Sequence, residues 1–290
     1  MNFRQAVAAN LDAMDGVLDD AMPDLLAAVA QAERDLTRFL VALPEDAEGW
    51  TVSKQRGLLL QLKALRERTG DRASAAIHRD LRAGAWSAGK ESLVSLARMA
   101  RAAEREFGGV QPLRLDVAAV LASSERTLLH RMGSISERYG VRVGDRLRRD
   151  LMVGILHGET QDQMAARLLA GTGEIRRLKD RGELAEGAAD RFAQIARSDA
   201  DRIVRTELVN AYNEVGIDGM RAANDNDPGF EKRWDAQQDA RECEGCRELD
   251  HQIVALNENF QSAFYGSLEH SPAHSRCRCA VIPWRRGWSW

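Results

Sequence analysis

The four cysteines of this 290-residue chain lie in two close pairs between positions 243 and 279. Two residues separate Cys243 from Cys246, one residue separates Cys277 from Cys279, and His274 comes just before the second pair. Two such pairs on either side of a long segment bring soft ligands to one point, as structural zinc sites with four nitrogen and sulfur ligands require. The cysteines therefore predict a C-terminal region that folds around one zinc ion per chain.

Disulfides and free thiols are the alternatives to a metal. The first residues, Met1–Asn10, lack the sustained apolar segment of a signal peptide. No stretch approaches the ~20 apolar residues of a membrane span. We therefore expect a reducing compartment, where disulfides are rare. The segment 247–276 between the pairs is longer than the ~15–20 residues of common zinc ribbons, so the spacing defines the class of site better than its type.

More candidate ligands are present than a tetrahedral ion needs. The candidates are Cys243, Cys246, His274, Cys277 and Cys279. In an extended segment Cys277 and Cys279 point to the same face, and His274 can replace one of them on a tight turn after Pro272. We expect Cys243, Cys246 and Cys277 to bind the ion, with either Cys279 or His274 as the fourth ligand.

The rest of the chain is typical of long helices. Charged residues make up 29% and aromatic residues 6% of the sequence, and the net charge of −3 gives no global reason to bind nucleic acid. Apolar residues recur at helical spacing within residues 2–43, which predicts a helix or a helix pair. A second helical region, 54–107, is expected to be capped by Ser53 and interrupted at Thr69–Asp71.

Two further helices are expected at 115–138 and 144–156, separated by a break at Tyr139–Val141. Gly158 then ends a helix, and Thr160 with Gln163 forms a capping box for the next helix, 161–169. That helix has no basic or amide-rich face to contact bases, so packing explains this helix–turn–helix better than DNA recognition does. One apolar stripe per helix predicts a bundle.

A charged connection is expected at 171–186 and a long helix at 188–223. Arg202, Arg205 and Val209 lie along one side of this helix, and we expect a charged face that packs on its neighbours, because a catalytic role for Arg205–Glu207 would need a pocket. After the turn at 224–229 the pattern changes. Strands are expected at 230–239, 249–256 and 279–284. We therefore predict a mainly α protein with a small α+β C-terminal domain, that is, an elongated helical bundle followed by a short-stranded, zinc-binding, β-rich domain. The expected domains are 1–143, 144–229 and 230–290.

Several short motifs follow one another between about residues 145 and 283. They are Gly154–Thr160, an Arg-Thr-Glu sequence with a following Asn in the long helix, Trp234 five residues before Asp239, Asp-x-Arg-x-Cys-x-x-Cys at 239–246, and Pro-x-His-x-x-Cys-Arg-Cys at 272–279. Together they resemble the Mu F-like family of phage head-morphogenesis proteins. Ser275 stands where the family usually has Pro, and Asp250 where it commonly has Gly.

The resemblance implies a structural, non-enzymatic minor head protein of a tailed phage, prophage or phage-like particle. Such a protein is present in several copies at the portal vertex or in the head interior, and it is made in the cytoplasm of the bacterial host. It serves head assembly, DNA packaging or DNA delivery. Its partners would be the portal protein, other head proteins and packaged DNA, with no membrane. The N-terminal helices would contact the portal or capsid, and the zinc ligands would be the five residues named above.

Two other classes of function remain open. A zinc-stabilised nuclease or effector needs a general base, for which His251 beside Asp250 is the one candidate. A nucleic-acid-binding adaptor would use the tail, where Trp284, Trp288 and Trp290 flank two arginines. The acidic balance of the last 90 residues opposes that function, and we expect these tryptophans to pack against the protein instead. His251 and His270 are expected to be polar surface residues.

Overall fold

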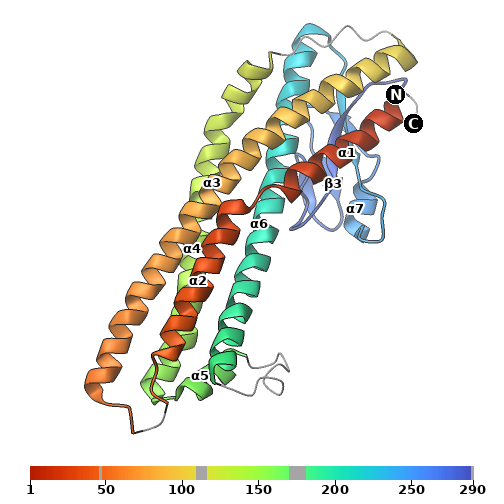
Figure 1. Ribbon diagram of the computed structural model, residues 1–290. Coiled ribbons are helices and arrows are strands. Elements are labelled where there is room, and N and C mark those ends of the chain that lie inside the picture. Colours follow the sequence, from red (N-terminus) through yellow and green to blue (C-terminus); the bar gives the residue numbers. More distant parts are fainter. Residues whose placement is uncertain (46–47, 109–115, 170–180, 289–290) are drawn as a thin grey trace. The chain divides into compact units, whose positions relative to one another are not determined.

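The computed structural model describes residues 1–45, 48–108, 116–169 and 181–288, and it confirms a mainly helical chain with a small C-terminal sheet (Figure 1). The helices are α1 (Phe3–Asp19), α2 (Pro23–Val41), α3 (Val52–Phe107), α4 (Val117–His157), α5 (Gln161–Leu168), α6 (Arg181–Asn226) and α7 (Glu244–Leu249). The strands are β1 (Glu231–Asp235), β2 (Ile253–Ala255), β3 (Phe260–Ser262), β4 (Gly266–Leu268) and β5 (Ala280–Trp284). Within the described ranges, no helix is both long and apolar enough to cross a membrane.

The chain forms two compact units, and each is discontinuous in sequence. Unit 1 contains Met1–Ala21, Leu81–Met132 and Arg202–Trp290. Unit 2 contains Met22–Asp80 and Gly133–Asp201. The helices α3, α4 and α6 therefore contribute residues to both units. The division of the sequence at residues 143 and 229 stays a prediction.

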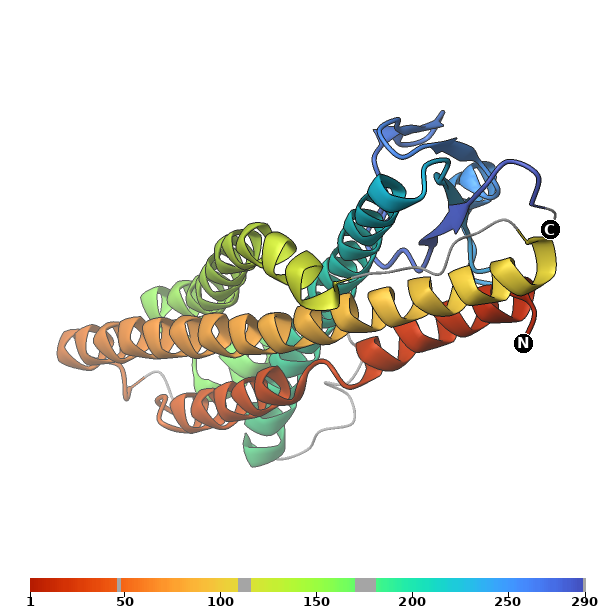
Figure 2. The same cartoon turned by 90° about the horizontal axis from the view of Figure 1, so that it is seen from above.

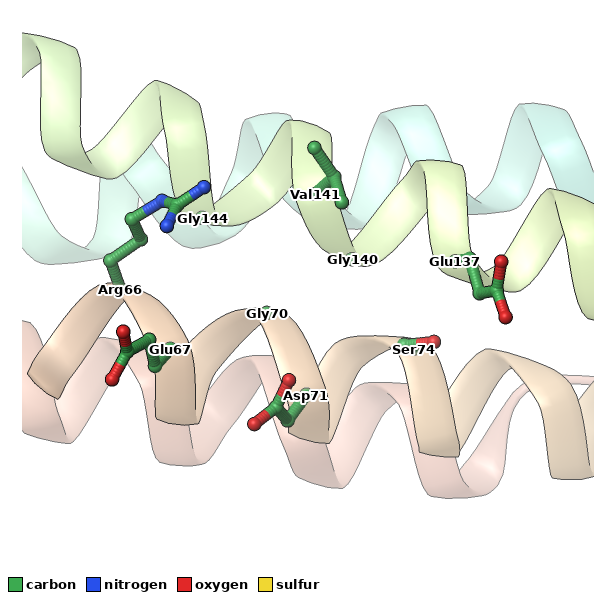
Figure 3. Close-up of a pocket in the computed structure, with 9 residues that line it drawn as sticks. All are labelled: Arg66, Glu67, Gly70, Asp71, Ser74, Glu137, Gly140, Val141 and Gly144. Carbon is green, nitrogen blue, oxygen red and sulfur yellow. The ribbon is translucent and has the colours of Figure 1, made fainter. Parts of the chain in front are cut away.

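Two of the predicted helix breaks are wrong. Thr69–Asp71 lies inside α3 and Tyr139–Val141 inside α4, and both helices continue without interruption. A Cβ atom on Gly140 would lie 2.5 Å from the carbonyl oxygen of Gly70. Figure 3 shows the two glycines facing each other where the helices of unit 2 cross. These glycines allow the helices to approach closely, and this packing outweighs the ~0.5–1 kcal/mol that glycine costs inside a helix.

The crossing leaves an open groove of about 220 Å³ between α3 and α4. Its lining includes Arg66, Glu137 and Val141, drawn as sticks in Figure 3. Arg66 forms an ion pair with Asp145 at 2.8 Å. The groove is therefore a product of the glycine contact and has a polar rim.

Helix ends follow local side-chain chemistry, with one correction. Thr51 caps α3 by accepting a hydrogen bond from the Lys54 amide at 3.1 Å, so the predicted cap, Ser53, lies within the helix. The predicted capping box is confirmed, because the Thr160 side chain accepts from the Gln163 amide and the Gln163 side chain accepts from the Thr160 amide. Gly158 has a φ of 67°, as a glycine that ends a helix does.

The long helix at 188–223 is confirmed within α6, which begins earlier and ends later than predicted. Residues 181–186 of the expected connection belong to α6, and residues 171–180 lie outside the described part of the chain. The C-terminal half of α6 lies beside the strands of unit 1 (Figure 2). It therefore forms the support on which the C-terminal region folds.

The sheet of unit 1 has the strand order β2-β1-β5, and both pairings are antiparallel. Trp234 of β1 is fully buried and packs edge-on against Phe260 at 5.2 Å between ring centroids. The strand expected at 249–256 is shorter than predicted, because Leu249 ends α7 and only Ile253–Ala255 pairs with β1. β3 and β4 form a separate hairpin.

The tail residue Trp288 packs inside unit 1. Its ring stacks on Phe107 at 5.7 Å and meets Phe3 edge-on at 5.0 Å between centroids. The Phe3 amide also donates to Glu106 at 2.7 Å. These contacts hold α1, the end of α3 and the tail together, whereas Trp290 lies outside the described residues.

Candidate metal centre

The first cysteine pair lies at the start of the short helix α7. Cys243 is the N-cap residue, and its Sγ accepts a hydrogen bond from the Cys246 amide at 3.3 Å. Gly245 lies between the two, and a Cβ atom at this position would overlap the ring of Tyr265. The helix start therefore orients both sulfur atoms, while the glycine lets an aromatic ring cover them.

The second group of candidates lies on a turn that leads into β5. The Cys277 amide donates to the His274 carbonyl at 3.1 Å, and Arg276 takes a left-handed conformation with a φ of 62°. Cys277 and Cys279 are almost completely buried. The predicted tight turn thus places His274 and Cys277 next to each other in the backbone.

All five predicted candidates come together in unit 1. His274 Nε2 lies 3.3 Å from Cys243 Sγ and 3.2 Å from Cys246 Sγ, and Cys246 Sγ lies 3.8 Å from Cys277 Sγ. Two sets have ligand atoms within 4.8 Å of one another, namely Cys243, Cys246 and His274, and Cys246, Cys277 and Cys279. Cys246 belongs to both sets, so it is the centre of the cluster, which we call the cysteine cluster.

The ionisation of the cysteine cluster favours a bound cation. Burial raises the pKa of Cys243, but hydrogen bonds from the Tyr265 hydroxyl and the Cys246 amide bring it to about 7. Close contact with the sulfurs of Cys277 and Cys279 raises the pKa of Cys246, whereas contact with Cys246 and Cys279 lowers the pKa of Cys277. Several thiolates cannot stay charged at these distances without a positive partner, and a metal ion supplies that charge.

An ion pair joins the two segments that carry the candidates. Asp239 accepts from the Arg241 amide at 2.8 Å, as expected for a residue at the entry to the first cysteine pair. It also bonds both terminal nitrogens of Arg278, which lies between Cys277 and Cys279, at 2.7 and 2.8 Å. This contact with Arg278, together with the Arg241 amide, holds the pKa of Asp239 below its usual range.

Two neighbours of the cluster were not predicted from the sequence. The Tyr265 hydroxyl lies 3.4 Å from Cys243 Sγ, and its ring lies 5.5 Å from the His274 ring. The Ser271 hydroxyl lies 3.5 Å from Cys277 Sγ and is fully buried. The one sequence signal for the Tyr265 contact is Gly245 between the first two cysteines, since a glycine at such a position indicates that another group approaches the backbone closely.

His251 and His270 belong to neither set of close ligand atoms among the described residues. His251 Nε2 lies 3.3 Å from Asp250, and the His270 ring contacts the Ser271 carbonyl at 2.6 Å. Asp250 itself accepts from the Ala236 amide and from the side chain of Gln238. The carboxylate beside His251 is therefore used to hold the loop after β1.

Comparison with known families gives one match. Residues 144–282 match the family model described as Phage Mu protein F like protein. The matched region begins in α4, continues through α6 and ends in β5, and it includes the whole cysteine cluster. No curated protein and no solved structure gives a significant match.

Proposed function

Residues 144–282 belong to the Mu F-like family of phage head proteins, and we therefore propose that the chain is a structural minor head protein of a tailed phage, prophage or phage-like particle. It acts at the portal vertex or in the head interior, in several copies, and serves head assembly, DNA packaging or DNA delivery. The family match over the long helix and the cysteine cluster is the observation that carries this proposal.

The helices that precede the matched region provide the surface for head proteins. Several large apolar side chains on α3 are exposed, including Leu60 and Trp86, whose exposed fractions are 65% and 52%. Exposed aromatic side chains such as Trp86 are typical anchors of protein interfaces. We therefore assign contacts with the portal protein to this part of the chain.

Native particles test this role. The chain is expected in particles purified from an induced lysogen or infected culture, and it should co-purify with the portal protein when empty heads are dissociated. Replacement of Leu60 and Trp86 by Ser should weaken the portal contact without loss of helix content. Absence from particles together with failure to bind the portal would refute the proposal.

The proposed cofactor is one structural zinc ion per chain. Cys243, Cys246 and Cys277 would hold it, with His274 or Cys279 as the fourth ligand. Bound zinc would neutralise the thiolates and join α7 to the turn before β5, and a closed shell of four protein ligands leaves no position for a substrate. We accordingly propose no catalytic role. Metal analysis of the reduced protein should give about one zinc per chain, whereas two disulfides and no metal would refute this assignment.

Contact with packaged DNA is supported by a row of arginines on α4. Arg138, Arg142, Arg146 and Arg149 recur at spacings of four and three residues, so they share one helix face, and all are exposed. Arg146 forms an ion pair with Asp199, but the other three have no acidic partner among the described residues. The row gives a local attraction for phosphates that the net charge of the chain does not.

Salt dependence tests the DNA contact. Each phosphate contact contributes about 0.9 to the slope of log affinity against log salt, so loss of three contacts should reduce the slope by up to about 3. The test variant replaces Arg138, Arg142 and Arg149 by Gln. The control replaces Arg56, Arg82 and Arg101, exposed arginines that form no such row. If the slope of log affinity against log salt were equal for the two variants, the α4 arginines would not contact DNA.

A further inference from the structure

One face of α6 contacts the backbone of the segment that carries His274, Cys277 and Cys279. Thr206 and Asn213 lie seven residues apart, two helical turns, and therefore on the same side of the helix. Neither residue is a candidate ligand. Both bond to main-chain groups of residues 276–281 within unit 1.

Asn213 acts on β5 as a neighbouring strand would. Its side-chain oxygen accepts from the Val281 amide at 2.6 Å, and its nitrogen donates to the carbonyls of Cys279, at 3.4 Å, and Val209, at 2.8 Å. The side chain is 1% exposed, so these bonds replace all contact with water. The amide thus fixes the position of the backbone on both sides of Ala280, next to Cys279.

The orientation of this amide is fixed by its partners. Val281 offers an N–H group, which requires an oxygen from Asn213, and Cys279 offers a carbonyl, which requires an N–H group. The next residue that faces outward along this edge is Pro283, which has no amide hydrogen to satisfy. Asparagine is the one uncharged side chain of this length that carries both a carbonyl oxygen and an N–H group.

Thr206 holds the other end of the segment. Its hydroxyl donates to the Arg202 carbonyl at 2.6 Å and accepts from the Arg276 amide at 3.2 Å. Arg276 is the left-handed residue of the turn between His274 and Cys277. The hydroxyl therefore fixes the turn at the point that sets the direction of both candidate ligands.

We propose that Thr206 and Asn213 are positioning residues of the metal centre, which hold the segment His274–Val281 on α6 with its ligand atoms directed at Cys243 and Cys246 before a metal binds. This inference rests on the metal site of the proposed function. Loss of outer-shell hydrogen bonds that orient metal ligands typically changes metal affinity about 10-fold to 100-fold, and we expect an effect of this size here.

Cobalt binding to the reduced full-length chain tests the proposal, since Co²⁺ is a coloured substitute for zinc whose thiolate absorption reports how many cysteines bind. Thr206→Val and Asn213→Ala should each weaken Co²⁺ binding about 10-fold or more, and Asn213→Ala should reduce the thiolate absorption at saturation. Thr206→Ser keeps the hydroxyl and should restore the wild-type affinity. Asn213→Asp keeps only the bond from Val281 and should bind Co²⁺ more weakly than wild type.

Two matched controls separate positioning from general stability. Thr37→Val removes a hydroxyl that bonds a carbonyl of its own helix, as Thr206 does, but far from the cluster in sequence and in unit 2. Asn224→Ala removes an amide that holds the Gly229 and Phe230 main chain at the end of α6. Both should leave the Co²⁺ spectrum and affinity unchanged.

The outcomes are distinct. If wild type binds Co²⁺ and the Thr206 and Asn213 variants match the controls in spectrum and affinity, the positioning role is refuted while the metal site stands. If wild type binds neither Co²⁺ nor Zn²⁺, the metal site fails and the positioning role fails with it. Circular dichroism of each apo variant identifies any variant that misfolds. In that case the Co²⁺ affinity of Thr206→Ser is compared with that of Thr206→Val, since both are mild changes at a partly buried position, and this comparison decides the result.

Discussion

The glycine crossing of α3 and α4 in unit 2 and the cysteine cluster in unit 1 are stabilised in opposite ways. At the crossing, Gly70 and Gly140 allow direct backbone contact, and no polar group is needed. In the cluster, ionisable side chains converge that would repel one another if charged, and either protonation or a bound cation relieves the repulsion. The first region depends on the absence of side-chain atoms, whereas the second, under the proposed zinc assignment, would depend on a component that the chain does not contain. Conditions that unfold one region should therefore leave the other intact.

Removal of the metal should give the largest effect. Zinc binding contributes on the order of 10 kcal/mol to the folding of small zinc domains, so a chelator should destabilise β1, β5 and α7 first. Cys246→Ser should act in the same way, because Cys246 belongs to both sets of ligands. Hydrogen exchange measured by peptide should rise sharply over residues 231–284 and stay unchanged over residues 54–80.

The control for this experiment is His251→Ala, since His251 lies outside both sets of close ligand atoms found in the described residues. This variant should retain the protection of residues 231–284 and remain sensitive to the chelator. Equal exchange before and after chelation in wild type would show that the two regions do not differ in their need for a metal.

A methyl group at the glycine crossing should give the next largest effect, and in the other unit. A Cβ on Gly140 would lie 2.5 Å from a carbonyl oxygen and 2.8 Å from Ser74 Cβ. Overpacking of this kind costs about 1–3 kcal/mol, so Gly140→Ala should lower the free energy of unfolding by that amount. Urea unfolding followed by circular dichroism measures it, and the cobalt spectrum should not change.

Gly133→Ala is the matched control, because Gly133 lies on α4 two turns earlier and a Cβ there would meet nothing within 4 Å. This change should stabilise the helix by up to about 1 kcal/mol, since alanine favours helix more than glycine does. If both variants were stabilised, the close contact of α3 with α4 would be wrong.

The same contrast explains what the sequence predicted and what it did not. The cysteine spacing identified the cluster because ligand chemistry restricts which residues can meet, and the capping box at Thr160 is a local hydrogen-bond pattern. The sequence predicts helix breaks at Gly70 and Gly140, because a glycine inside a helix and a glycine at a break have the same local signal. Asn213 and Tyr265 were missed for a related reason, since their partners lie 68 and 22 residues away.

A third prediction concerns pH within the C-terminal sheet. Burial, followed by the nearby charge of Asp250, raises the pKa of Asp235 to about 7, although Arg233 opposes this. Between the unfolded value near 4 and about 7, the folded chain holds a proton that the unfolded chain has lost. The contribution of Asp235 is therefore fully present at low pH and is lost as pH rises through 7.

Asp235→Asn should remove this dependence and raise stability at pH 8 by about 1–3 kcal/mol relative to wild type, with little difference at pH 5. Asp239→Asn gives a comparison of opposite sign, because contact with Arg278 lowers the pKa of Asp239 and its contribution is lost only in acid. Urea unfolding at each pH measures both variants, and a pH-independent effect of Asp235→Asn would exclude titration of this carboxyl group.

The smallest expected effects come from a Tyr→Phe substitution made once beside the cysteine cluster and once in unit 2. Tyr265→Phe removes the hydroxyl next to Cys243, so the pKa of Cys243 should rise above about 7. A thiol must lose its proton to bind a metal, so metal affinity should fall about two- to tenfold at pH 6.5, the value of one hydrogen bond, and much less at pH 8.5.

Tyr139→Phe removes a hydroxyl that donates to the Ala196 carbonyl in unit 2. It should lower the free energy of unfolding by about 0.5–1.5 kcal/mol and leave metal affinity unchanged at both pH values. If Tyr139→Phe also altered metal binding, packing in unit 2 would be coupled to the cysteine cluster, and the independence of the two regions would be lost.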